Sequence, residues 1–143
     1  MNPLIIRPPQ MRALREAFLT EWLHAELKKL FPKACAARGP AGLERFVTEG
    51  VRRAREREFT RDDLLPYLAM EICFGEAFLE DPANEWARQA LRGPAVRRMQ
   101  RLRRAGIFRL AARVERERRQ KAAWAEAERD LPDSQPAEDQ ASG

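Results

Sequence analysis

The apolar residues of this 143-residue chain recur every three to four positions in several separate stretches, which is the spacing of amphipathic α-helices. Proline and glycine interrupt the stretches at residues 31–32, 39–40 and 92–94, because neither residue continues a helix well. Only seven glycines accompany ten prolines, which argues against a glycine-punctuated β-sandwich. The pattern therefore predicts an all-α fold, an irregular bundle of four to five helices.

The expected helices cover residues 9–31, 41–57, 60–75, 83–91 and 94–128. The first carries one broad inward stripe, made of Met11, Leu14, Phe18, Trp22, Ala25 and Lys29 and widened by Leu23, Leu27 and Leu30. The third is apolar around most of its circumference, so we expect it to be the buried central helix. Pro66 requires that this helix either starts close to Pro66 or is kinked there.

The ends of the helices carry further signals. Thr60 is a favourable N-cap for the third helix. Phe78 and Leu79 are expected to anchor an ordered loop, and residues 52–58 read as a solvated, charged helix face. The last helix keeps an inward stripe only as far as Val114, so residues 115–128 are expected to be an exposed helical extension.

Length and composition predict one domain with appendages. We expect a helical core domain over residues 1–92, a long basic helix over 93–129 whose first half packs on the core, and a disordered acidic tail over 130–143. No stretch approaches the length of a membrane span, and the lead before Pro8 is too short for a signal peptide. These features predict a cytoplasmic protein without a membrane segment.

The net charge of +5 is distributed unevenly along the chain. Residues 1–91 hold 14 basic and 14 acidic side chains, residues 92–129 hold 13 basic and 4 acidic ones, and residues 130–143 hold 4 acidic ones alone. The basic character therefore belongs to one segment, and a local basic patch attracts a polyanion or an acidic protein surface.

The sequence predicts no catalytic, metal or cofactor residues. His24 is the single histidine and is expected at the surface or at an interface. Cys35 and Cys73 lack the spacing of a zinc motif, so two buried free thiols are expected, and a disulfide between them is the alternative. A group of carboxylates near Gly75 is expected to lie on solvated helix faces and in a turn; it comprises Glu71, Glu76, Glu80, Asp81 and Glu85. An acid–base pair among them remains an alternative.

Two groups of side chains are candidates for binding a partner. The aromatic candidates are Phe74, Phe78 and Trp86, with Trp22 as a further member; the alternative is that these aromatics form the core. The basic candidates are Arg97, Arg98, Arg101 and Arg104. For the arginines three interpretations stay open: a solvated helix without a ligand, a docking surface for an acidic protein, or a nucleic-acid contact.

Several separated motifs in one order resemble a family of small bacterial proteins. They are an Ile-Ile-Arg-Pro lead, a Met-x-x-Leu-x-x-Ala-Phe helix, Phe31-Pro32, Gly42-Leu43-x-x-Phe46, Gly50-Val51-x-x-Ala54, Phe59-Thr60, Phe74-Gly75-x-x-Phe78 and Asp81-Pro82-x-x-x-Trp86-Ala87. The family is all-helical and is often encoded beside type VI secretion effector and PAAR genes. The resemblance covers residues 3–92, and the long basic helix that follows departs from it.

The resemblance implies an accessory role in type VI secretion: an effector chaperone, an adaptor or an immunity partner, which would bind a secreted effector or a component of the secretion tip. The sequence thus predicts a non-enzymatic binding protein. The alternative is a nucleic-acid-binding accessory protein that uses the arginine-rich helix. Oligomeric state stays open, although Trp124 would allow the exposed extension to pair with a second copy of itself.

Overall fold

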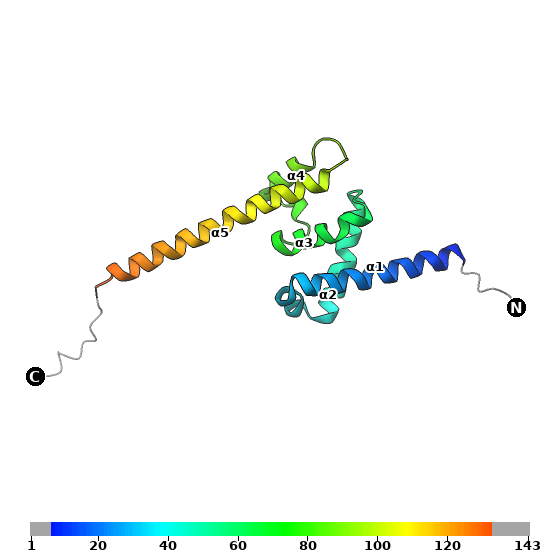
Figure 1. The fold of residues 1–143 in the computed structure, drawn as a ribbon, viewed down its shortest axis with the longest axis horizontal. Helices are drawn as coiled ribbons and strands as arrows, with labels where there is room; N and C mark the ends of the chain where they lie inside the picture. Colours follow the sequence, from blue (N-terminus) through cyan, green and yellow to red (C-terminus); the bar gives the residue numbers. More distant parts are fainter. Residues whose placement is uncertain (1–6, 133–143) are drawn as a thin grey trace, which may run out of the picture. The chain divides into compact units, whose positions relative to one another are not determined.

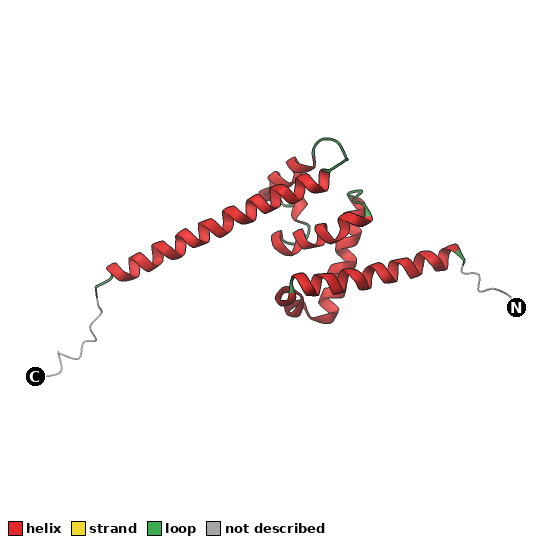
Figure 2. Ribbon diagram, viewed as in Figure 1, coloured by secondary structure: helices red, strands yellow, loops and turns green. Residues whose placement is uncertain are grey.

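A computed structural model describes residues 7–132 of the chain. Five α-helices and three short 3₁₀ turns lie within this range, which contains no β-strand (Figure 2). The predicted all-α class is thereby confirmed. The predicted apolar lead and most of the predicted acidic tail, residues 133–143, fall outside the described range.

The chain divides into two compact units, Met1–Gly106 and Ile107–Gly143. The last helix, α5 (Arg98–Asp130), contributes to both. Its buried residues are Met99, Leu102 and Gly106, all of them in the first unit. Val114, the last residue of the predicted inward stripe, is exposed, and so is Ile107. The exposed part of this helix therefore begins at Ile107, earlier than the stripe of apolar residues indicated.

In the first unit, α1 (Pro8–Leu30) packs on α2 (Pro32–Glu56) and on α3 (Leu64–Phe74), and α2 also packs on α3 (Figure 1). A new helix begins directly at Pro32, a position where the missing N–H of proline costs nothing. Helix α2 is kinked at Gly39, whose φ of 71° is outside the helical region. The predicted break at residues 39–40 is confirmed, and the segment before it is helical as well.

The start of α3 explains how a helix accommodates Pro66. The Asp63 carboxylate accepts hydrogen bonds from the backbone N–H and the hydroxyl of Thr60, at 3.0 and 2.9 Å. One 3₁₀ turn, η1 (Arg61–Asp63), follows Thr60, and α3 begins at Leu64. Pro66 therefore lies in the first turn, where no backbone N–H is needed. Every residue of α3 is buried or half-buried, which confirms it as the central helix.

The segment after α3 consists of two 3₁₀ turns, η2 (Phe78–Glu80) and η3 (Pro82–Asn84), and the short helix α4 (Glu85–Leu91). Phe78 and Leu79 are both buried, as predicted for anchors of this loop. The guanidinium of Arg88 donates hydrogen bonds to the carbonyl oxygens of Leu79 and Asp81, at 2.9 and 2.7 Å. These contacts hold the turns against α4.

Gly50 lies at a close contact between α2 and α3. A Cβ atom at Gly50 would overlap Cδ2 of Leu68 and would lie 3.0 Å from Oε1 of Glu71. At Gly42, in the same helix, a Cβ would meet only Cβ of Arg38 at 3.4 Å. The absence of a side chain at Gly50 thus allows the two helices to pack.

We expect Gly50→Ala to lower the free energy of unfolding by about 1–3 kcal/mol, because an extra methyl group in a filled core forces its neighbours to shift. Gly42→Ala is the matched control, and it should raise the free energy of unfolding by up to about 1 kcal/mol through helix propensity. Urea denaturation followed by circular dichroism measures both. Equal effects of the two substitutions would contradict the close packing at Gly50.

Candidate partner-binding surfaces

Helix α1 carries two apolar rows, and only one of them is buried. Leu19, Leu23 and Leu27 belong to the core. Phe18 and Trp22 are 61% and 49% exposed. At 3.6 residues per turn the two rows lie about 100° apart around the helix, so the same neighbouring helices do not cover both. The prediction of one broad inward stripe is confirmed for Leu23 and Leu27. It is wrong for the exposed members of the stripe, which are Leu14, Phe18, Trp22, Ala25, Lys29 and Leu30.

The exposed side of α1 carries large apolar side chains that recur every four residues. Leu14, Phe18 and Trp22 follow one another four residues apart, so they lie on one face of the helix. Leu14 is 44% exposed, and we call these three residues the apolar row. Isolated exposed apolar residues are common, but a contiguous group of them marks a contact surface.

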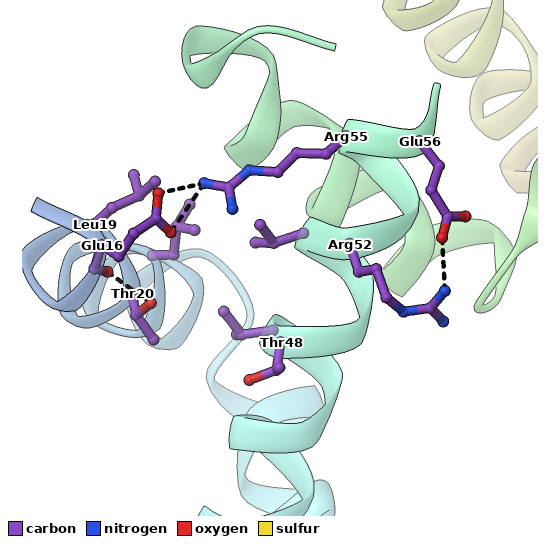
Figure 3. Close-up of a pocket in the computed structure, with 10 residues that line it drawn as sticks. Glu16, Leu19, Thr20, Thr48, Arg52, Arg55 and Glu56 are labelled. Atoms are coloured by element: carbon purple, nitrogen blue, oxygen red, sulfur yellow. Dashed lines mark hydrogen bonds and ion pairs between the residues drawn. The ribbon is translucent and has the colours of Figure 1, made fainter. Parts of the chain in front are cut away.

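An open groove of about 480 Å³ lies between α1 and α2 (Figure 3). Its apolar lining consists of Leu19, Leu23, Val47 and Val51. Such a groove has room for an apolar side chain from another molecule. The sequence did not predict it, because its lining residues come from two helices that are brought together only by folding.

Polar side chains line the rest of this groove. The guanidinium of Arg55 on α2 donates to both carboxylate oxygens of Glu16 on α1, at 2.7 and 2.9 Å. Arg52 donates to Glu56 at 2.8 Å within α2. Figure 3 shows Glu16 and Arg55 reaching toward each other from the two helices. About half of each side chain in the Glu16–Arg55 pair is exposed, so the pair contributes no more than about 1 kcal/mol and can rearrange for a ligand.

The predicted aromatic candidates form a cluster at the edge of the core. The Phe74 ring lies 4.9 Å from the Trp86 ring in an edge-on arrangement and 6.0 Å from the Phe78 ring, measured between centroids. Phe78 is only 1% exposed, while Phe74 and Trp86 are half-buried and pack against the core. The structure therefore brings these three residues together, but Phe78 lies beneath the surface. The exposed aromatic side chains of the first unit are instead Phe18 and Trp22.

Two of the four candidate arginines make contacts inside the first unit. The Arg98 guanidinium donates to the carbonyl oxygen of Arg57 and lies 4.4 Å from the centroid of the Phe59 ring. Arg101 donates to the carbonyl oxygens of Ala90, Pro94 and Val96, at 3.0, 2.7 and 3.1 Å. Both side chains hold α5 against the segments that precede it.

The other two candidates, Arg97 and Arg104, are exposed. They belong to a run of residues, 92–113, that contains eight arginines and no acidic residue. Arg92 and Arg103 in this run are exposed as well, although Arg92 pairs with Glu85 at 3.1 Å. We call the exposed set Arg97, Arg103 and Arg104 the arginine surface of the first unit.

Glu71 is the largest departure from the predicted charge pattern. It was expected on a solvated face, yet it is 0% exposed. Its carboxylate accepts hydrogen bonds from Nε and Nη2 of Arg53, from the Tyr67 hydroxyl and from the Ala77 backbone N–H, all between 2.7 and 2.9 Å. Arg53, also predicted to be solvated, is nearly covered. Both predictions are wrong because α2 and α3 place the opposite charges together inside the first unit.

The surroundings shift the pKa values of the partners of Glu71. The hydrogen bond to Glu71 raises the pKa of Arg53 above its ordinary value. Burial, followed by the nearby charge of Glu71, raises the pKa of Tyr67 well above its ordinary value. Both directions keep these groups protonated as donors to the Glu71 carboxylate, so the arrangement supports the fold.

The remaining predicted chemistry is dispersed over the first unit. Glu76 pairs with Arg38 at 3.0 Å, and hydrogen bonding by Arg88 lowers the pKa of the exposed Glu85 carboxyl. Among the residues described, no three histidine, cysteine or acidic side chains are grouped to hold a metal ion. Cys35 is a buried thiol, while Cys73 is a half-buried thiol, and His24 is also half-buried.

Comparison with known proteins gives no family model, no curated protein and no solved structure that matches the chain. The resemblance to proteins encoded beside type VI secretion genes therefore stays a prediction. Over residues 7–132, no helix is both long and apolar enough to cross a membrane.

Proposed function

We propose that this protein is a cytoplasmic, non-enzymatic binding protein that holds another protein through the apolar row of α1. In line with the sequence resemblance, the partner is a type VI secretion effector or a component of the secretion tip. The protein then serves as a chaperone, an adaptor or an immunity partner. The observation that carries the proposal is the exposure of Leu14, Phe18 and Trp22 along one face of α1.

The row has the dimensions of a helix-binding surface. Leu14 and Trp22 are eight residues apart, which is about 12 Å along a helix axis. Aromatic side chains contribute most to binding when a partner covers them completely, and Phe18 and Trp22 stand next to each other in the row. An amphipathic helix of the partner, with its apolar residues three and four positions apart, matches this surface.

The charge of the first unit indicates the chemistry of the partner. The arginine surface, Arg97, Arg103 and Arg104, lies in a run without acidic residues. Guanidinium groups bind carboxylates in a bidentate manner. We therefore expect the partner to combine an apolar helix face with acidic side chains, so that the arginines increase the rate of association and the row supplies the affinity.

The test measures binding of the full-length chain to each purified product of the neighbouring effector genes by calorimetry. The double variant Phe18→Ser/Trp22→Ser is expected to weaken binding by about 30-fold or more. Phe108→Ser is the matched control, since Phe108 is equally apolar and is exposed on α5. Its affinity should equal that of the original chain.

The thermal melting of each variant shows whether the fold is intact. The apolar row is excluded as the site if the double variant binds as tightly as the original chain. The accessory role is excluded if the original chain binds none of these products.

A second candidate function rests on the same run of arginines. A chain with eight arginines and no acidic residue over residues 92–113 also suits the phosphates of a nucleic acid. In that case, affinity for a fluorescent DNA duplex or RNA strand should fall steeply with salt, and Arg103→Glu/Arg104→Glu should remove it. The Phe18→Ser/Trp22→Ser variant should then bind nucleic acid unchanged.

A further inference from the structure

The second unit contains a helix whose apolar residues have no cover within the part of the chain that the structure describes. From Ile107 to Asp130, α5 is continuous, and all of its residues are exposed except Leu110 and Ala125, which are half-buried. Ile107, Val114 and Trp124 are among its exposed large apolar residues. Most of the stability of a helix in a protein comes from packing of its apolar face, so a partner helix would stabilise this one.

Most of the large apolar residues of this helix follow a seven-residue repeat, whereas Phe108 lies outside it. Residues that are alternately three and four positions apart lie along one seam of a helix. In this helix the seam consists of Ile107, Leu110, Val114, Glu117, Lys121, Trp124, Glu128 and Leu131. Five of the eight are apolar. Glu117 and Lys121 interrupt the seam near its centre, and polar residues at such positions decide how two helices pair.

The two central charges select one arrangement of two copies. In a parallel pair in register, Glu117 would face Glu117 and Lys121 would face Lys121, which places like charges in the seam. In an antiparallel pair centred on Arg119, residues equally distant from position 119 face each other. Lys121 of each copy then faces Glu117 of the other, which gives two ion pairs.

The same antiparallel register also matches the apolar residues. Val114 faces Trp124 of the second copy, and Ile107 faces Leu131. Leu110 faces Glu128, which is the weakest layer. The residues that follow Leu110, Glu117 and Trp124 flank the seam and pair with one another across it, so Ala111 lies near Ala125 of the second copy, and Arg118 lies near its own counterpart at some cost. Four of the eight layers are thus apolar on both sides, two are ion pairs, and two are mixed. This agreement between charge and apolar positions is what a surface built for a second copy requires.

We propose that residues 107–131 form an antiparallel coiled coil with the same segment of a second copy of this chain. Each chain of the dimer would carry its own copy of the apolar row. The inference uses residues that the proposed function does not use, and each can fail without the other.

The first test measures the mass of the full-length chain in solution by light scattering over a concentration series. A mass twice that of one chain is expected. Lys121→Glu places like charges in both central layers and should weaken self-association by about tenfold or more. Adding Glu117→Lys to the same chain restores opposite charges and should restore the dimer. The Phe18→Ser/Trp22→Ser variant is the control and should dimerise like the original chain.

The second test examines the direction of pairing. Ala111→Cys and Ala125→Cys chains, mixed under oxidising conditions, should give a disulfide between peptides 111 and 125, identified by mass spectrometry. Neither chain alone should form a disulfide at its new cysteine. A monomeric original chain, or a dimer that persists in Lys121→Glu, would overturn the proposal. A dimer without the mixed disulfide would overturn the antiparallel arrangement.

Discussion

Replacing Glu71 by alanine is expected to lower the free energy of unfolding by about 3–5 kcal/mol, the cost of breaking a buried ion pair from one side. The substitution leaves the Arg53 guanidinium nearly buried without its carboxylate, at the former site of two hydrogen bonds of 2.8 and 2.7 Å. It also removes the acceptor of the Tyr67 hydroxyl and of the Ala77 N–H. Chemical denaturation followed by circular dichroism measures the change.

The loss at Glu71 includes a backbone contribution. Ala77 has a φ of 54°, a left-handed conformation that a non-glycine residue adopts at a cost. The Glu71 carboxylate accepts a hydrogen bond from the backbone N–H of Ala77. Without that acceptor the turn leading to Phe78 should loosen. Glu76→Ala is the matched control, because Glu76 is partly exposed and its pair with Arg38 lies on the surface.

The control should change the free energy of unfolding by no more than about 1 kcal/mol. A Glu71→Ala effect as small as that of the control would show that the ion pair does not support the fold. Glu71→Gln should lie between alanine and the original residue, since the amide oxygen keeps one acceptor and the amide nitrogen repels the arginine.

Phe78→Ala is expected to lower the free energy of unfolding by about 3–5 kcal/mol, as for other large aromatic residues removed from a core. Phe78 is almost fully buried, and its ring contacts Tyr67 at 5.9 Å and Phe74 at 6.0 Å between centroids. The cavity would open beneath the two 3₁₀ turns, so α4 should lose its support as well. Thermal and chemical denaturation measure the loss.

Phe18→Ala is the matched control for this prediction, because it removes the same side chain from the apolar row of α1. It should change the free energy of unfolding by less than about 1 kcal/mol, while it weakens partner binding. The reverse result would be a stable Phe78→Ala chain that has lost partner binding. It would show that the partner binds at the aromatic cluster of Phe74, Phe78 and Trp86, as the sequence predicted.

The sequence predicted helix boundaries well where the signals are local. Gly39 and the residue before Pro32 interrupt helices through their own backbone preferences. Thr60 and Asp63 start the central helix through contacts three residues apart. In each case the residues that decide where a helix begins or ends are close together along the chain, so the sequence alone predicts the boundary.

The candidate site was predicted less well, because its residues depend on which face of a helix finds a neighbour. Phe18 and Leu19 are both apolar and adjacent, and periodicity alone does not tell which of them α2 and α3 cover. Arg98 and Arg101 were candidates for binding a partner, and their guanidinium groups bind backbone carbonyl oxygens of Arg57 and Ala90. No feature of an arginine-rich run distinguishes these two from Arg104.

The sequence by itself determined the all-α class, the breaks between helices, the central position of α3 and the concentration of positive charge after residue 91, since these follow from local backbone preferences, periodicity and composition. Only the tertiary structure decided that Glu71 and Arg53 are buried partners, that Phe78 belongs to the core and that the apolar row of α1 is exposed. The physical reason is that burial is a property of pairs of surfaces. Whether an apolar or charged side chain meets water or another element is decided when the helices pack.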